Sequence, residues 1–483
     1  MKSIKILTGL ALLCLSGNVM AQNETDALRY SRLGIGGTAR VQGMGGSQVA
    51  IGADAGNLAG NPAGLGLYRR SEFTFTPGLS NGNTSSQVDN NTSVDQRNGL
   101  NLSGLGLVFT RRKSDGTEGD WRNGSFGIGF TRQNTFQNKF NYNRLTGPTE
   151  STIVESIVEN ADAFGLSPNN DLATLEDLAY ETYLINQDDD GYYGIERKGQ
   201  IQQSEDILSQ GAQNQWDFAY GASYRDKLYL GGAIGFNTLR YTQERNFSEV
   251  ETDASTYFQS LDLRDVFTTT GNGINARVGF IYKPYDFIRF GGSIQSPTYF
   301  SMRDEYQTSL NVQEYESHQE ATDPGEYTYN LTTPLRANGG VAFFLEKYGF
   351  ISGDVEFVNY SKARLNDPTD SDVFRSTNNR ISTAYNSTVN VKIGAEGRYE
   401  IFRVRAGYAH YGDPYKNSDY DRQQSVITAG AGIRQANYFL DVALVNTDYN
   451  SIYSPYVLND GTQPVINTRN RYNNVLFTVG FNF

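Results

Sequence analysis

The residues able to do chemistry in this chain are few and lie far apart. His318 and His410 are the only histidines, and both fall in or beside segments that we expect to form outer loops. A Ser-His-Asp triad or a His-rich metal site needs several such side chains close together, and two isolated histidines support neither. We therefore predict that the chain is not an enzyme, and that it has no catalytic residues, no metal and no cofactor.

One acidic stretch resembles the beginning of a calcium-binding loop. The polar residues of 186–191 match the first positions of such a loop, but the twelfth position, which requires a carboxylate, falls on Arg197. We expect this stretch to be an ordinary surface loop.

The only cysteine, Cys14, lies in a segment with the features of an export signal. Two lysines precede the apolar run Ile6–Leu15, and small residues occupy positions −3 and −1 before a cleavage point. We predict that Met1–Ala21 is a signal peptide and that the mature chain begins at Gln22. Such a chain has no disulfides and no thiol chemistry.

The charge and hydropathy exclude two classes of protein. The net charge is −12, and it becomes −14 when the two lysines of the signal are removed, so a phosphate-binding nucleic-acid surface is not expected. No apolar run of about 18 residues follows the signal, which excludes an α-helical membrane protein. The abundance of Gly, Tyr and Phe is typical of a membrane β-barrel, but composition alone leaves a soluble secreted β-protein open.

The periodicity favours the barrel. In 475–483 every second residue is Val or Phe, and the residues between them are mostly small or polar. A strand with one apolar and one polar face fits lipid outside and a lumen inside. The terminal Phe483 is of the kind that barrel-assembly machinery recognises.

Four arginines fall on the polar faces of such strands. They are Arg277, Arg289, Arg403 and Arg405. An arginine on the lipid face would cost about 2–4 kcal/mol near the midplane, so we expect all four to point into the lumen. There they could contact the carboxylate of a ligand. Alternatively, they pair with luminal acids, such as Asp354, Glu356, Glu396 and Asp441.

Strand-like segments recur about fourteen times, and tight turns alternate strictly with long loops. The segments start near Ser71, Asn98, Arg122, Gln215, Lys227, Asn272, Phe287, Thr333, Gly349, Thr388, Phe402, Ser425, Tyr438 and Tyr472. The long loops are Thr135–Asn214, Arg240–Gly271, Ser296–Thr332, Tyr360–Ser387 and Tyr449–Arg471, and the first contains two predicted amphipathic helices, Thr152–Phe164 and Leu172–Ile185. We predict an all-β fold: an antiparallel transmembrane barrel of about fourteen strands over 71–483 in the outer membrane of a Gram-negative bacterium, with both termini periplasmic.

A Gly-rich segment, Gln22–Arg70, precedes the first strand. It is longer than a barrel requires, and small residues dominate it, as a segment confined in a lumen would need. No strand-loop-helix unit follows its glycines, so a phosphate-binding loop is not expected. We predict that this segment is a plug inside the barrel.

Several stretches resemble a known family. ARVQGMGGSQVAIGADAGNLAGNPAGLG, with Gly43, Gly45 and Gly46 and the triplet Asn61-Pro62-Ala63, resembles the N-terminal hatch of the FadL/OmpP1/TodX family of outer-membrane transporters of hydrophobic compounds, in the style of Bacteroidetes members. Further matches lie at Pro334–Lys362, Val391–Tyr415 and Gly430–Leu444.

The resemblance implies a fourteen-stranded barrel and passive uptake of hydrophobic molecules such as long-chain fatty acids. A ligand would be captured outside, enter a luminal pocket, and leave sideways into the bilayer when the hatch, including Asn61, Pro62, Ala63 and the glycines 43, 45 and 46, shifts. The partners would be membrane lipid, lipopolysaccharide and a hydrophobic small molecule. The sideways exit needs an interrupted strand, for which Gly104, Gly106, Gly124, Gly127 and Gly129 are candidates.

Two other functions are weighed against uptake. The barrel could be a non-transporting interaction subunit of an outer-membrane secretion or assembly complex, and the long outer loops fit that reading equally. A general porin is disfavoured, because the plug would obstruct water and solutes.

Overall fold

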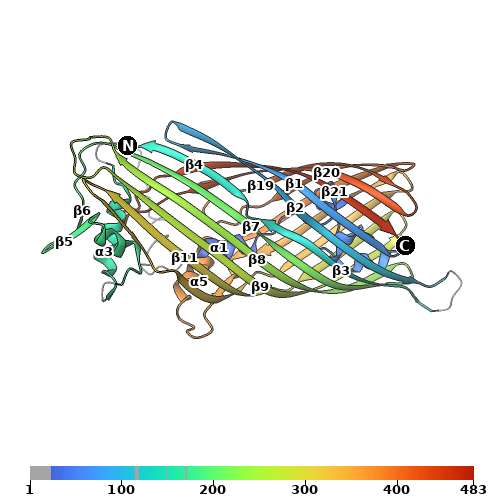
Figure 1. Ribbon diagram of the computed structural model, residues 1–483. Helices are drawn as coiled ribbons and strands as arrows, with labels where there is room; N and C mark the ends of the chain where they lie inside the picture. The colour runs from blue at the N-terminus through green and yellow to red at the C-terminus, as the bar shows by residue number, and fades with distance from the viewer. Residues whose placement is uncertain (1–22, 115–118, 148–149, 169–170) are drawn as a thin grey trace, which may run out of the picture.

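The computed structural model describes residues 23–483, apart from 115–118, 148–149 and 169–170. The predicted signal peptide Met1–Ala21, with Cys14, and the predicted first mature residue Gln22 lie outside the described residues. The rest forms an antiparallel barrel, drawn on its side in Figure 1. The ring closes because β1 (Glu72–Val88) pairs with both β2 (Asn91–Arg112) and the last strand, β21 (Ile466–Asn482).

The predicted all-β barrel of about fourteen strands is confirmed. Between β2 and β21 the ring follows chain order, each strand antiparallel to its neighbours. Its other strands are β3 (Trp121–Thr135), β7 (Ile201–Tyr224), β8 (Leu228–Glu251), β9 (Ser260–Tyr285), β10 (Ile288–Gln295), β14 (Arg336–Leu345), β15 (Gly349–Asn359), β17 (Ser387–Tyr399), β18 (Phe402–Tyr411), β19 (Gln424–Arg434) and β20 (Tyr438–Tyr453).

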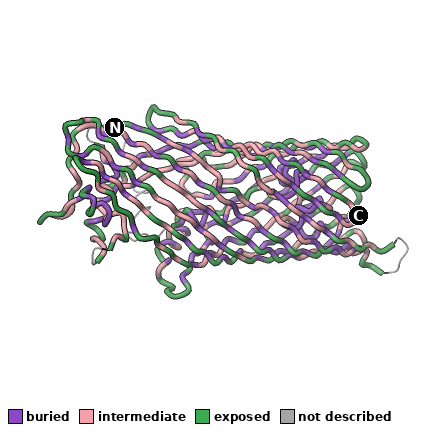
Figure 2. Tube along the Cα trace, in the orientation of Figure 1, coloured by how far each residue is buried: buried purple, intermediate pink, exposed green. Residues whose placement is uncertain are grey.

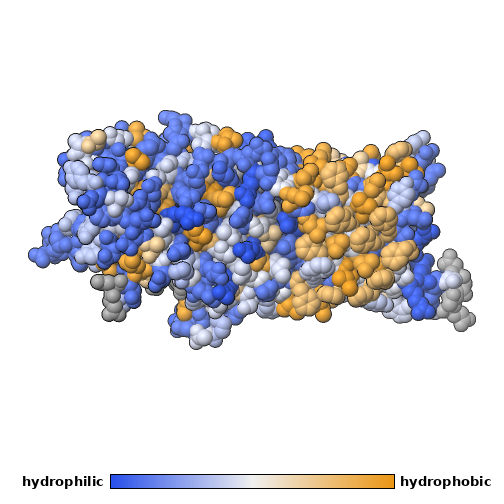
Figure 3. All heavy atoms as spheres, viewed as in Figure 1, coloured by the Kyte–Doolittle hydropathy of each residue, from blue (hydrophilic) through white to orange (hydrophobic). Residues whose placement is uncertain are grey.

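An apolar belt surrounds one half of the barrel. Figure 3 shows it over the half that ends in the tight turns, while the other half is polar. On β8 the outward residues Leu230, Ile234 and Phe236 are 42–50% exposed, and the residues between them point inward. A belt of exposed apolar side chains is stable only against lipid, so the barrel spans a membrane with this half. We call the two ends the short-turn end and the long-loop end.

The barrel wall continues far beyond the belt. β7, β8 and β9 are 24, 24 and 26 residues long, whereas about 9–11 tilted residues cross a bilayer. The prediction that Arg240–Gly271 is a loop is therefore wrong: β8 runs to Glu251 and β9 begins at Ser260. The sequence misled here because outward residues above the lipid are polar, while the hydrogen-bond ladder between strands does not depend on side-chain polarity.

The other long loops also contain regular structure. They hold β4 (Asn138–Leu145), α3 (Ile153–Phe164), α4 (Leu175–Glu181), β5 (Ile185–Asp188), β6 (Gly191–Gly194), β11 (Tyr299–Gln313), β12 (Ser317–Ala321), β13 (Gly325–Thr332), η4 (Tyr360–Lys362), β16 (Arg364–Asn366) and α5 (Arg375–Ala384).

The two helices predicted in the first long loop are confirmed, although α4 is shorter than expected. Thr152 caps α3 by accepting from the Val154 N–H, and Glu155 completes a capping box. The acidic stretch 186–191 forms the β5–β6 hairpin rather than a calcium loop. Among the described residues the helices are all too short or too polar to span a bilayer.

The Gly-rich segment lies inside the barrel, and we call Asn23–Arg70 the luminal segment. It contains α1 (Glu24–Ser31), α2 (Ala39–Gln42), η1 (Ala55–Leu58) and η2 (Pro62–Leu67), and most of its residues are buried (Figure 2). The described chain begins within the lumen at α1, whereas Phe483 lies at the short-turn end (Figure 1). The side of the membrane on which each terminus lies stays a prediction.

The belt generates a test on one strand. We expect Ile234→Arg to lower the free energy of unfolding by about 2–4 kcal/mol, because it places a guanidinium in hydrocarbon. Val250→Arg is the matched control: Val250 is also outward on β8 and 44% exposed, but it lies above the belt. Denaturant unfolding in lipid vesicles measures both variants, and equal losses would contradict the position of the belt.

Candidate functional site

The Asn61-Pro62-Ala63 triplet attaches the luminal segment to the wall. Asn61 is fully buried, and its Nδ2 donates to the carbonyl oxygens of Val49 (2.7 Å) and of Phe280 on β9 (3.0 Å). Its Oδ1 accepts from the Ala63 N–H at 3.2 Å and so begins η2, with Pro62 at the first helical position. One side chain therefore organises the turn and holds it to the barrel.

Glycines in the wall make room for this triplet. A Cβ on Gly231 would lie 2.4 Å from the Pro62 carbonyl carbon, and one on Gly279 would lie 2.0 Å from Asn61 Oδ1. The two backbones thus approach more closely than any side chain would allow.

The stretch 43–46 forms a second attachment on the other side of the ring. Gly45 has a φ of 66°, and its N–H donates to Thr428 Oγ1 on β19 at 2.9 Å. A Cβ on Gly407 of β18 would lie 2.2 Å from the Met44 carbonyl carbon and the Gly45 nitrogen. Counted around the ring, β18 and β19 lie about half a circumference away from β8 and β9. The luminal segment is therefore fixed to the wall at two distant places.

The wall itself has a seam between β2 and β3. Their ladder runs from the Arg112–Asn123 pair to the Gly104–Thr131 pair and stops there. Above this point β2 continues to pair with β1 down to Asn91, while β4 pairs only with β7. Among the described residues, no backbone ladder joins β2 to β4. Side chains bridge them instead: Asp95 of β2 accepts from the Asn141 N–H of β4 at 2.7 Å and lies 3.3 Å from Lys139.

The interruption of the third wall strand does not lie where the sequence suggested. β3 ends at Thr135 and β4 begins at Asn138, so the strand is interrupted at Phe136 and Gln137. Of the candidate glycines only Gly104 lies at the seam; a Cβ on Gly127 or Gly129 would instead meet Leu58 of the luminal segment. Those glycines admit the luminal segment and do not break the strand.

The luminal segment covers the inner side of the seam. The Gly34 N–H donates to the Gln133 carbonyl at 2.8 Å, and Asn134 Nδ2 donates to the Arg32 carbonyl at 3.1 Å. A Cβ on Gly36 would lie 2.7 Å from Thr131 Cγ2. The stretch 32–36 therefore lies directly against β3 where its pairing with β2 stops.

An aromatic cluster adjoins the seam on the lumen side. Phe136, at the break, makes edge contacts with Tyr30 of α1 (ring centroids 5.9 Å apart) and Tyr241 of β8 (5.5 Å). These rings belong to a larger buried apolar cluster, which includes Ala27, Leu28, Leu239, Phe300, Met302, Tyr329, Leu331 and Ile381. Outside, Leu79 and Leu100 are 51% and 76% exposed beside the upper part of β2. Apolar surface is therefore present on both sides of the seam.

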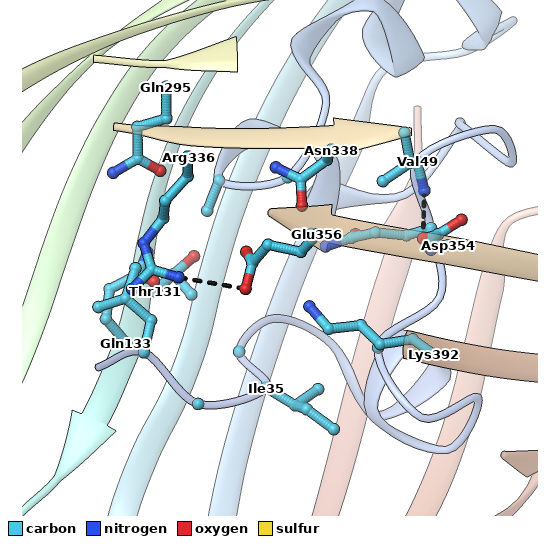
Figure 4. Close-up of a pocket in the computed structure, with 18 of the residues that line it drawn as sticks. Ile35, Val49, Thr131, Gln133, Gln295, Arg336, Asn338, Asp354, Glu356 and Lys392 are labelled. Carbon is cyan, nitrogen blue, oxygen red and sulfur yellow. Dashed lines mark hydrogen bonds and ion pairs between the residues drawn. The ribbon is translucent and has the colours of Figure 1, made fainter. Parts of the chain in front are cut away.

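A small polar cavity lies between the luminal segment and the wall (Figure 4). Its volume is about 80 Å³, and it is lined by 33–36 together with Arg277, Arg336, Glu356 and Lys392. Figure 4 shows Arg336 directed at Glu356, and the two are 3.2 Å apart. Small-molecule pockets begin at about 300 Å³, so this cavity is too small for such a ligand as it stands.

The four predicted arginines do not come together. Arg405 is fully buried between Glu396 (2.9 Å) and Asp441 (2.6 Å), so pairing with luminal acids is the outcome there. Arg403 donates to the carbonyls of Glu400 and Phe402.

The other two arginines line different cavities. Arg277 lines the polar cavity, donates to Gln295 Oε1 at 2.5 Å, and lies 3.6 Å from Asp217. Arg289 lies at the short-turn end, where its Nη1 donates to the Ile51 carbonyl at 2.7 Å. Asp354 pairs with neither arginine, and it accepts hydrogen bonds from the Gln48 and Val49 N–H groups instead.

Sequence reasoning missed Arg336 and Lys392 as parts of the cavity. Both fall on inward positions of β14 and β17, but nothing in the local pattern says which inward residues face the luminal segment. His318 makes an edge contact with the Tyr183 ring in the outer loops (centroids 5.1 Å apart), and His410 lies on β18.

Comparison with solved structures shows which barrels share this arrangement. The toluene transporter TodX of P. putida matches with a TM-score of 0.53 and 13% identity, over 93% of this chain and 99% of the other. A Pseudomonas aeruginosa FadL homologue matches with a TM-score of 0.57 and 11% identity, over 93% and 98%. The Ralstonia pickettii toluene transporter TbuX gives 0.51 and 15%, over 93% and 99%.

The chain has the FadL/TodX fold. The resemblance predicted from the N-terminal glycines and the Asn-Pro-Ala triplet is thereby confirmed at the level of the fold. No protein-family model and no curated protein sequence matches the chain. Identities of 11–15% over nearly the whole length mean that the FadL/TodX fold has been kept while most side chains differ.

Two adjacent glycines of this fold give a direct test of the attachment. We expect Gly231→Ala to displace the Asn-Pro-Ala turn and to lower stability by about 1–3 kcal/mol, because the new methyl would overlap backbone atoms. Gly232→Ala is the matched control, since a Cβ there lies 3.8 Å from its nearest neighbour, the Arg277 carbonyl. Thermal unfolding measures the loss of stability, and ion conductance in planar bilayers detects displacement of the turn. Equal behaviour of the two variants would contradict the close approach.

Proposed function

We propose that the chain is an outer-membrane channel for the passive uptake of hydrophobic molecules, with the luminal segment as its gate. A ligand enters from the long-loop end, occupies the aromatic cluster around Phe136, and leaves sideways through the seam into the bilayer. The observation that carries the proposal is the coincidence of three features at one place: a stretch of wall without a backbone ladder, apolar surface on both sides of it, and a Gly-rich stretch covering it from within.

Energetics favour this direction of movement. An apolar molecule that leaves water for hydrocarbon gains roughly 25 cal/mol per Å² of apolar surface, so no other energy source is needed. The barrier is the luminal segment, and the polar cavity is too small for a ligand until 32–36 moves. Only two direct hydrogen bonds, at Gly34 and Asn134, hold that stretch to β3, whereas the Asn61 and Gly45 attachments are tightly packed. The stretch next to the seam is therefore the part of the luminal segment best able to move.

The chemistry beside the seam favours an amphiphilic ligand such as a long-chain fatty acid. TodX and TbuX are toluene transporters, and toluene has no charged group. Here, Arg277, Arg336 and Lys392 line the cavity next to the aromatic cluster, together with Asp354 and Glu356, so the cations outnumber the carboxylates. Once 32–36 moves, these cations would contact a carboxylate while the acyl chain lies among the rings.

Locking the gate tests the route. In the double variant Gly36→Cys with Thr131→Cys the two side chains are close enough for a disulfide. We expect the oxidised protein to lose most of its uptake of a fluorescent fatty acid, and the reduced protein to recover it. Each single variant, which cannot form the bond, is the control. Undiminished uptake after complete oxidation would contradict exit at this seam.

Charge removal tests the ligand class. We expect Arg277→Gln to lower the amount of fatty acid that co-purifies with the protein, measured by mass spectrometry, and to leave retention of toluene unchanged. Arg264→Gln is the control, because Arg264 lies in the polar half and pairs with Glu244 at 2.9 Å. If nothing apolar co-purifies and a large partner protein does, the barrel is an interaction subunit instead.

A further inference from the structure

A second and larger cavity opens at the short-turn end. Its volume is about 780 Å³, within the range of about 300–1,000 Å³ typical of small-molecule sites. The turn residues Asp226, Asp286 and Glu346 form part of its rim, and residues 51–53, 66 and 67 of the luminal segment form part of its floor. In barrels of this kind the short turns face the periplasm, so the cavity is reached from that side.

The lining of this cavity is cationic, although the chain carries a net charge of −12. Seven arginine or lysine side chains line it, against three carboxylates. Two of the cations are neutralised within the lining: Arg112 lies 2.9 Å from Asp226, and Lys283 lies 2.7 Å from Asp286.

Three further cations contact carboxylates that lie behind the lining. Arg40 and Arg398 share Glu396, at 3.0 and 2.8 Å, and Arg434 lies 3.9 Å from Asp441. Glu396 and Asp441 are also the partners of the buried Arg405. Arg40 also lies 3.5 Å from Asp54. Three carboxylates thus serve four guanidinium groups, and positive charge remains in excess.

Arg289 is the residue best placed to bind an anion. Among the described residues it makes no ion pair, its Nε is buried without a hydrogen-bond partner, and its guanidinium carbon lies 4.2 Å from the Phe344 ring centroid. A guanidinium held flat against an aromatic ring presents its remaining N–H groups as a fork, which matches a carboxylate or phosphate. Arg69, exposed at the end of the luminal segment, also lines this cavity, and it has no ion pair with any residue that the structure describes.

We propose that this cavity binds a small amphiphilic oxyanion from the periplasm, with its phosphate or carboxylate on Arg289 and its apolar part against Phe344 and Phe287. The apolar side of the lining, which also includes Ile51 and Leu67, selects such a molecule over a bare inorganic anion. This site is separate from the seam and does not depend on the proposed uptake.

Binding there would act on the luminal segment. The hydrogen bond that Arg289 donates goes to the carbonyl of Ile51, which belongs to that segment. An oxyanion on Arg289 therefore contacts the wall and the luminal segment together, and holds them in their present arrangement. Ligand binding would therefore stabilise the arrangement in which the luminal segment fills the barrel.

Calorimetry on the full-length mature protein in detergent tests the proposal with four probes: phenyl phosphate, benzoate, inorganic phosphate and phenol. We expect phenyl phosphate or benzoate to bind saturably, more tightly than inorganic phosphate or phenol, and the stronger of the two to identify the headgroup. Arg289→Gln should weaken that binding about tenfold or more, as expected for the loss of a charged hydrogen bond. Arg225→Gln, at the same end but outside the cavity and paired with Asp120, should leave it unchanged.

A second variant covers the case in which Arg289→Gln fails to fold. Arg69→Gln changes an exposed side chain, and it should weaken binding several-fold without affecting heat-modifiable migration of the barrel. The proposal is overturned if neither phenyl phosphate nor benzoate binds saturably, if phenol binds as tightly as they do, or if Arg225→Gln causes the same loss as the cavity variants.

Discussion

Close approach of two backbones is the constraint on which the rest of this structure depends. The luminal segment fits inside the ring because glycine stands at each contact: on both sides where Gly45 faces Gly407, and on the wall side where Gly231 and Gly279 face the Asn61-Pro62-Ala63 turn. A methyl group at most of these positions would overlap a backbone atom. At these contacts main chain therefore lies directly against main chain, and larger side chains such as Met44 and Leu58 pack beside them.

The wall holds some parts of the luminal segment more tightly than others, and this difference determines which part can move. Fully buried Asn61 and the Gly45–Thr428 contact fix the segment at two distant parts of the wall. Between α1 and α2 the chain is held to β3 by two hydrogen bonds, where the ladder between β2 and β3 has stopped. Local openings in proteins concentrate where buried contacts are fewest. The loosely attached stretch of the luminal segment thus lies against a part of the wall that has no backbone ladder.

The sequence predicted the strand ends correctly at the short-turn end but not at the long-loop end, for a physical reason. At the short-turn end, tight turns such as Glu346–Gly349 interrupt the alternation, and the predicted starts of β15, β18 and β20 agree with the structure. At the long-loop end the strands leave the lipid, so alternation fades while pairing continues. The Asn61-Pro62-Ala63 turn was found because its motif is local. The seam was not, because it arises from which strands fail to pair, and the break at Phe136 contains no glycine. Arg336 and Lys392 were missed for the same reason: their neighbours come from distant parts of the chain.

The closure of the ring by β1 and β21 bears on the order in which the molecule assembles. The contact of the Ala39 N–H with Thr478 Oγ1 joins residues 439 positions apart, and the β1–β21 ladder spans a similar separation. Contacts of that separation form only after almost the whole polypeptide has been delivered, because the entropy of closing so long a loop must be overcome first. The residues that emerge first from synthesis are thus among the last to reach their places.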